Sequence, residues 1–274
     1  MVEDSSFLTS ADAARYLGVS ITSIKRWADV GLLPCAKTAG KHRRFERRAL
    51  DAFRLRLEDT DAASVNTRVG EDVWGHLLGA GSELGIVGWL YGLRDRLGSW
   101  CRVTEALGPV IEELGERWVR GEISIFDEHI ASERLSRALA RISGELTPVP
   151  SAPHALLVTA DGDDHTLGLA LVEVVLKEQG FRTIWLGRRT PTPELIAAID
   201  QHRARLVCVS ASLHSDDEAV LKAQARKLAV ACRVRGATLV LGGRGGWPPV
   251  VPSAQVVRDL AGLQRIAQGL RQRV

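Results

Sequence analysis

The sequence predicts a multidomain chain: a small helical unit, an all-helical bundle and an α/β domain with a parallel sheet. Short apolar runs alternate with amphipathic helical patterns over 153–274, which is typical of a buried parallel sheet. Residues 66–147 show only the three- and four-residue apolar spacing of helices. Residues 1–58 contain short helical patterns separated by glycine, and the polar segment 59–69 follows as a linker.

The bulk composition favours a cytoplasmic globular protein. The chain has 274 residues with a formal net charge of +3. No apolar run approaches the ~20 residues that a membrane-spanning helix needs, and the first residues do not resemble a secretion signal. The cysteines do not show the Cys-x-x-Cys spacing that is typical of zinc and redox sites, so we interpret them as small core residues: Cys35, Cys101, Cys208 and Cys232.

Residues 1–58 predict a helix-turn-helix. Thr9 or Ser10 can cap a first helix that ends near Leu17, and a second helix is expected over 21–30. A basic stretch, Gly-Lys-His-Arg-Arg-Phe over 40–45, predicts a small β wing before a third helix. This order, "LTSADAARYLGVSITSIKRWADVGLLP" followed by "GKHRRF", resembles the winged helices of the MerR/excisionase group.

The charge is concentrated in this first part. Residues 25–48 contain eight basic and two acidic side chains, a local charge of +6, and a basic block of this kind indicates contact with a polyanion. The resemblance implies that the partner is double-stranded operator DNA, with the helix over 21–30 in the major groove and Lys25 and Arg26 near phosphates or base edges. It also implies that the wing contacts the DNA backbone through Lys41, His42, Arg43 and Arg44.

The middle part predicts a small four-helix bundle, because four helical patterns follow one another at roughly 70–78, 82–97, 100–119 and 122–144. Within it, Trp118 is followed after nine residues by Glu128 and His129. The spacing Trp-x9-Glu-His resembles the helical half of the CarH-type adenosylcobalamin photoreceptors. In that family the tryptophan covers the upper face of the corrin, and the Glu-His pair lies beside the adenosyl group.

The last part predicts a flavodoxin-like, Rossmann-like domain. The expected strands are 155–159, 183–186, 206–210, 238–241 and 254–257, and helices are expected at about 166–179, 193–202, 216–234 and 258–271. Ligands of such sheets bind beyond the carboxyl ends of the strands. His165, Ser210 and the pair Gly242-Gly243 all fall at those ends.

A motif with clear chemistry follows the first of these strands: Asp163-x-His165-x-x-Gly168. A histidine on a loop can offer one ring nitrogen to a metal, while a nearby carboxylate holds the other ring N–H and fixes the tautomer. The glycine lets the backbone pass close to a bulky ligand. The motif resembles the cobalamin-binding domain of base-off/His-on corrinoid proteins, which implies that His165 is the lower ligand of cobalt.

Taken together, the three parts resemble the CarH/LitR-type regulators. In that family adenosylcobalamin binds in the dark, the protein assembles as a tetramer and represses transcription, and light cleaves the cobalt–carbon bond and loosens the assembly. The resemblance implies a homo-oligomer, dimer or tetramer, and not an enzyme. Ser210 would contact the nucleotide tail, and Gly242 and Gly243 would lie against its benzimidazole. The leucine of the Ser-x-Leu element lies one place late at Leu213, which weakens the assignment of Ser210.

One departure from the family pattern leaves open whether light is the signal that the protein senses. In well-understood members a histidine directly follows the tryptophan and captures cobalt after photolysis, whereas this chain has Val119, which has no lone pair to donate. The alternatives are therefore a light-responsive repressor, a regulator that senses cobalamin or another tetrapyrrole without light, and a corrinoid carrier or enzyme. The basic helix-turn-helix disfavours the last of these.

Overall fold

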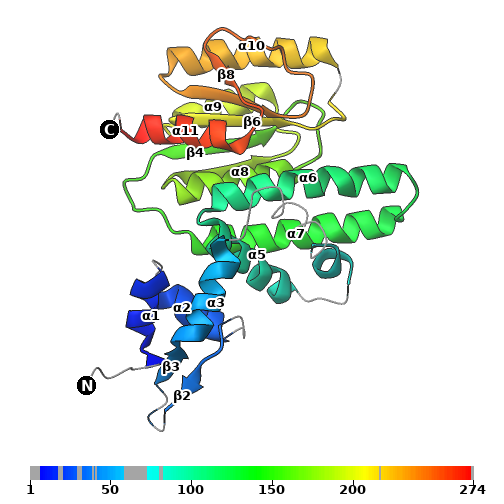
Figure 1. Ribbon diagram of the computed structural model, residues 1–274. Coiled ribbons are helices and arrows are strands. Elements are labelled where there is room, and N and C mark those ends of the chain that lie inside the picture. Colours follow the sequence, from blue (N-terminus) through cyan, green and yellow to red (C-terminus); the bar gives the residue numbers. More distant parts are fainter. Residues whose placement is uncertain are drawn as a thin grey trace. The chain divides into compact units, whose positions relative to one another are not determined.

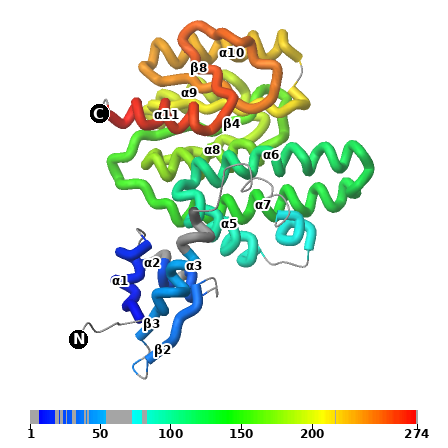
Figure 2. The backbone as a smooth tube through the Cα atoms, in the orientation of Figure 1, coloured from blue at the N-terminus to red at the C-terminus, as the bar shows by residue number. Residues whose placement is uncertain are grey.

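A computed structural model describes residues 7–17, 21–29, 33–38, 40, 42–58, 73–79, 83–215 and 217–272. The chain divides into two compact units (Figures 1 and 2). The first comprises residues 1–72 together with Tyr91–Arg96, and the second comprises Val73–Leu90 and Leu97–Val274. No helix of the described residues is long and apolar enough to cross a membrane.

Within residues 7–58, the described part of the first unit forms helices and a small antiparallel sheet. Its elements are β1 (Phe7–Leu8), α1 (Ser10–Leu17), α2 (Ile21–Asp29), β2 (Ala36–Lys37), β3 (Arg43–Glu46) and α3 (Arg47–Glu58). The strands lie in the order β1-β3-β2, so β2 and β3 form an antiparallel hairpin.

Local chemistry explains where α1 begins. The Thr9 hydroxyl accepts a hydrogen bond from the backbone N–H of Asp12 at 3.2 Å, which makes Thr9 the N-cap rather than Ser10. The helices pack around a small core in which Trp27 and Phe53 lie with ring centroids 4.8 Å apart. Ile24 and Phe45 are fully buried in the same core, so the apolar positions of α2 and of the hairpin hold the unit together.

The second unit begins with helices. Residues 73–78 are helical and are followed by α5 (Glu83–Leu97), α6 (Trp100–Val119) and α7 (Ile125–Glu145). Within α5, residues Tyr91–Arg96 are grouped with the first unit. Ser124 and Asp127 form a capping box that starts α7. Figure 2 shows α6 and α7 running side by side and joined by a short turn. We call the end of α6 and the start of α7, residues 118–129, the helical tip.

The α/β part has a five-stranded parallel sheet, which confirms the predicted parallel architecture. Its strands are β4 (His154–Thr159), β5 (Arg182–Gly187), β6 (Leu206–Ala211), β7 (Thr238–Gly243) and β8 (Ala254–Val256), in the order β5-β4-β6-β7-β8. The helices are α8 (Leu167–Glu178), α9 (Thr192–Gln201), α10 (Glu218–Val234) and α11 (Leu260–Arg271).

Helices cover both faces of this sheet (Figure 1). One buried cluster joins the sheet to α9 and α10, and a second joins it to α8 and α11. Both faces are therefore dry, which explains why the strands are nearly continuous apolar runs. The chain order of the strands reverses between β4 and β6. In parallel α/β sheets such a reversal is generally where the ligand crevice lies, at the carboxyl ends of the strands.

The long helices α6 and α7 pack on the α8 and α11 side of the sheet. The Glu178 carboxylate of α8 accepts the backbone N–H of Trp100 at 2.9 Å, at the first residue of α6. Lys177 donates to the carbonyl of Ser143 at 3.0 Å, and Arg244, just after β7, pairs with Glu112 of α6 at 3.0 Å. These polar contacts fix the helices to the sheet domain within one unit.

Candidate cofactor site

The candidate site lies at the crevice between β4 and β6. After β4 the chain turns through Gly162, whose φ of 81° suits glycine, and reaches Asp163 before α8 begins. Asp163 is only 3% exposed, whereas the side chain of His165 is 56% exposed. A buried carboxylate therefore stands behind an accessible imidazole.

Hydrogen bonds explain how a buried carboxylate is tolerated here. The Asp163 carboxylate accepts the backbone N–H groups of Ser212 at 2.5 Å and His165 at 2.9 Å. The hydroxyls of Ser215 and Ser212 donate to it at 2.7 and 3.2 Å. Burial is the largest single influence and raises the pKa of Asp163, but these hydrogen bonds together outweigh it and hold the pKa below its usual value.

The ionised carboxylate sets the tautomer of His165. Nδ1 of His165 lies 2.9 Å from the Asp163 carboxylate, and an ionised carboxylate only accepts hydrogen bonds. Nδ1 therefore carries the proton, and Nε2 keeps a lone pair that is free to bind a metal. The hydrogen bond between Asp163 and His165 is the one that the motif predicts, and metal binding by Nε2 stays a prediction.

The loop has a second anchor at Asp164. Arg189, which follows β5, donates from Nε and Nη2 to the two Asp164 oxygens at 2.8 and 2.5 Å. Arg189 itself has a φ of 57°, in the left-handed region that non-glycine residues rarely occupy. The bidentate pair fixes the residue between Asp163 and His165 from the solvent side.

The predicted glycines have different reasons to be glycine. A Cβ on Gly168 would lie 3.2 Å from the Ser210 hydroxyl, so the first turn of α8 passes close to the end of β6. Gly243 has a φ of 87°, and a Cβ there would lie 2.2 Å from the carbonyl oxygen of Ala211. Gly242 has no such constraint, since its Cβ would make an ordinary 3.4 Å contact with Val257.

Three residues of the site were missed by sequence reasoning. Ser212 and Ser215 hold Asp163, and the His214 ring stacks on His165 with centroids 4.7 Å apart and an interplanar angle of 15°. All three lie on the loop after β6, far from the motif in sequence. The only signal was the place of this loop at the end of a buried strand.

The helical tip holds the other predicted cofactor residues. Trp118 is 40% exposed and Val119 is 78% exposed at the end of α6. On α7, Glu128 lies 2.5 Å from Nδ1 of His129 and accepts a hydrogen bond from Ser132 at 2.6 Å. The structure thus joins Glu128 to His129. Among the described residues, no hydrogen bond or ring contact links either of them or Trp118 to His165.

The predicted DNA-binding residues lie in the first unit. Lys25 on α2 and His42 before β3 are exposed, and Arg44 is half-buried on β3. Arg43 forms an ion pair with Asp29 of α2, which ties the hairpin to that helix. Lys41 and the side chain of Arg26 lie outside the described residues. A hollow of about 330 Å³ is lined by Lys25, His42 and Arg43 together with Ser10 and Lys37, and sequence reasoning did not single out Lys37.

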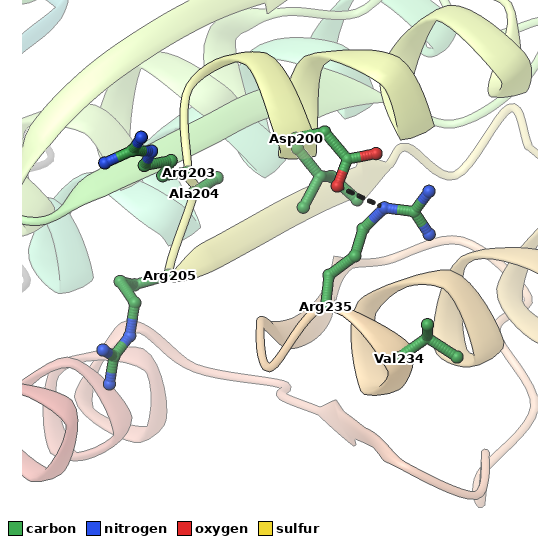
Figure 3. Close-up of a pocket in the computed structure, with 7 residues that line it drawn as sticks. Asp200, Arg203, Ala204, Arg205, Val234 and Arg235 are labelled. Atoms are coloured by element: carbon green, nitrogen blue, oxygen red, sulfur yellow. Dashed lines mark hydrogen bonds and ion pairs between the residues drawn. The ribbon is translucent and has the colours of Figure 1, made fainter.

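Another hollow, of about 530 Å³, lies at the amino ends of the strands, next to the start of β6 and opposite the His165 loop. Asp200 and Arg235 pair with each other beside it, while the guanidinium groups of Arg203 and Arg205 point away from that pair (Figure 3). Ligands of parallel α/β sheets bind at the carboxyl ends of the strands, so this hollow is a weaker candidate than the His165 loop.

Comparisons with known proteins match three parts of the chain in order. A helix-turn-helix domain matches residues 7–57, and two B12 binding domains match residues 76–143 and 153–246. The fold also resembles the monomethylamine corrinoid protein of Methanosarcina barkeri, with a TM-score of 0.52 and 16% identity over 75% of this chain and 99% of that one. The chain is thus of the class that joins a helix-turn-helix domain to B12 binding domains.

Two curated relatives are transcriptional repressors. The chain is 34% identical to the HTH-type transcriptional repressor CarA of Myxococcus xanthus over 37% of this chain and 34% of that protein. It is 29% identical to the repressor CarH of the same organism over 35% of this chain and 31% of that protein. These matches confirm the resemblance to CarH-type cobalamin-binding transcriptional regulators. The matched segments span about a third of the length of either relative.

Proposed function

We propose that the chain is a cobalamin-binding transcriptional regulator in which His165 is the lower ligand of cobalt. One observation carries the proposal: at the crevice where the strand order reverses, a buried ionised Asp163 holds Nδ1 of His165 and leaves Nε2 free. The protein then acts by binding rather than by catalysis.

The residues of this site suit a metal ion that a macrocyclic cofactor already coordinates. Across the described residues there is no group of three or more His, Cys, Asp and Glu side chains that would hold a bare ion. A tetrapyrrole supplies the remaining cobalt ligands itself, so one imidazole is sufficient. Gly168, Ser210, Gly242 and Gly243 at the same edge are the residues that would lie against the rest of the cofactor.

The helices suit a cover for the upper face. We propose that 66–147 acts as a four-helix cap in which Trp118 lies over the corrin and Glu128 and His129 lie beside an adenosyl group. The exposure of Trp118 supports this role, because a large aromatic side chain left in solvent has apolar surface to bury against a ligand. Adenosylcobalamin would supply a light-labile cobalt–carbon bond.

The first unit would bind operator DNA as a winged helix. We propose that α2 enters the major groove with Lys25 and Arg26, and that the hairpin braces the DNA backbone through Lys41, His42 and Arg44. Arg43 would act mainly by holding the hairpin against α2, since its charge is already paired with Asp29. Copies linked as a dimer or tetramer would bind tightly in the dark, because the second contact becomes intramolecular.

A second candidate is a regulator that senses cobalamin or another tetrapyrrole without light. Val119 favours it, because an exposed valine stands at the position where, in the CarH/LitR-type family that the sequence resembles, well-understood members have a cobalt-capturing histidine. His129 or water would have to take that role in this chain.

Absorption spectra test the cofactor assignment. His165→Ala is expected to weaken cobalamin binding and to shift the visible spectrum towards the water-ligated form. Asp163→Asn is expected to weaken binding by about 10- to 100-fold, as is typical for partners of a metal ligand. Cobalamin bound to His165→Ala with an unchanged spectrum would show that His165 is not the ligand.

Light scattering decides between the two regulators. The adenosylcobalamin-bound protein is run on a sizing column in the dark and after green light. A fall in mass after illumination is expected for the light-responsive repressor, whereas equal masses with cobalamin still bound support the light-independent sensor.

A further inference from the structure

His214 makes a contact with His165 that the cofactor motif does not account for. Its ring is nearly parallel to the His165 ring, with centroids 4.7 Å apart. The two residues come from loops that follow different strands, β4 and β6, so their contact depends on the strand order of the sheet.

The loop that carries His214 is fixed by the same carboxylate that fixes His165. Ser212 donates its backbone N–H to Asp163 at 2.5 Å, and Ser215 donates its hydroxyl at 2.7 Å. Between them, the backbone N–H of His214 donates to the Ser212 hydroxyl at 3.2 Å. Asp163 therefore places both rings of the stacked pair.

Stacking supplies a restraint that the hydrogen bond lacks. The bond from Nδ1 of His165 to Asp163 fixes one edge of the ring but lets its plane tilt about that edge. The side chain of His165 is more than half exposed, so surrounding atoms restrain the plane weakly. A flat ring against one face holds the plane, and hence the direction of the Nε2 lone pair.

The geometry argues against His214 as a second ligand of the same metal. Imidazole lone pairs lie in the ring planes, and the two planes differ by only 15°. Lone pairs in nearly parallel, stacked planes do not converge on one atom at a bond length of about 2 Å.

From this geometry we infer that His214 is a positioning residue that orients His165 for cobalt. The inference rests on the proposed lower-ligand role of His165. It assigns His214 a stacking role, for which another flat ring can substitute.

The test compares His214→Ala with His214→Phe in the full chain. Hydroxocobalamin affinity is measured by absorption titration, and nitrogen ligation is read from the superhyperfine splitting of bound cob(II)alamin in electron paramagnetic resonance. His214→Ala is expected to lower the affinity by about 2- to 10-fold, the range of one aromatic contact, and to increase the fraction without axial nitrogen. His214→Phe, which keeps the ring but has no nitrogen, is expected to behave like the unsubstituted protein.

Val220→Ala is the matched control, because Val220 is exposed in the first turn of α10, directly after the same loop, and has no part in the proposed site. It should leave the affinity and the spectrum unchanged. Equal or tighter binding by His214→Ala would overturn the inference, and so would a phenylalanine variant as weak as the alanine variant. An unchanged spectrum in His165→Ala would instead refute the lower-ligand proposal, so the two failures are distinguishable.

Discussion

Replacing Asp163 with alanine should destabilise the protein even when no cofactor is bound. The carboxylate is 3% exposed and accepts the backbone N–H groups of His165 and Ser212 as well as the hydroxyl of Ser215. Alanine offers no acceptor, so two backbone N–H groups at the crevice lose their partner. Serine hydroxyls can rotate towards water, whereas backbone N–H groups cannot.

The magnitude follows from these two orphaned donors. A donor without a partner costs about 1–3 kcal/mol when it is buried, which gives an upper range of about 2–6 kcal/mol. Both donors are only partly buried, and water that enters the vacated space will satisfy part of the demand. We therefore expect Asp163→Ala to lower the free energy of unfolding by about 2–4 kcal/mol, a large share of typical domain stability.

Urea unfolding of the cofactor-free protein, followed by circular dichroism, measures this loss. Asp161→Ala is the matched control, since Asp161 is exposed two residues earlier and its carboxylate accepts only a 3.2 Å bond from Thr192. It should cost less than about 1 kcal/mol. If the two variants are equally stable, with equal denaturant slopes, the carboxylate does not organise the loops as described.

Two further outcomes are expected at neutral to mildly alkaline pH. Arg44→Gln should flatten the salt dependence of duplex binding by roughly one unit in log–log slope, whereas Arg43→Gln should change it less because Asp29 already pairs with Arg43. An unchanged slope for Arg44→Gln would remove that residue from the DNA interface. Thiol labelling of the folded protein at pH 8 should modify Cys35 alone, because the other three thiols are buried. Burial raises the pKa of Cys101 and of Cys232 to about 11, and it also raises the pKa of Cys208. Their labelling should accelerate as the pH rises towards 11, and rapid labelling of two thiols at pH 8 would contradict this assignment.

The parallel sheet was predictable because burial on both faces leaves a strong local signal. The apolar run 155–159 became β4, which covers His154–Thr159, and 238–241 became most of β7. The helices between these strands were predictable from their three- and four-residue apolar spacing, because one face of each helix is buried against the sheet. Helix starts leave a weaker signal in the sequence. Both Thr9 and Ser10 can cap α1, and the hydrogen bond from the backbone N–H of Asp12 identifies Thr9 as the cap.

The site was predictable only where it is local in sequence. Asp163 and His165 lie two residues apart, so their pairing was readable from the motif. Ser212, His214 and Ser215 reach the same point because β6 lies beside β4, with Thr159 opposite Ser210. Serine and histidine after a strand have many uses, and no pattern within their own loop indicates which carboxylate or ring they will meet. Asp29 and Arg43 in the first unit show the same limit.

The two glycines at the end of β7, Gly242 and Gly243, distinguish a glycine that the backbone requires from one that cofactor binding would require. Gly243→Ala should disrupt the sheet edge itself, because a Cβ would lie 2.2 Å from the Ala211 carbonyl at a positive φ, so its loss of function would say little about binding. Gly242→Ala would meet only Val257 at 3.4 Å, so the fold should tolerate it. If Gly242 is kept for close approach of a flat cofactor group, Gly242→Ala should weaken hydroxocobalamin binding while the urea midpoint stays unchanged. Equal binding by that variant would show that Gly242 is not kept for close approach of the ligand.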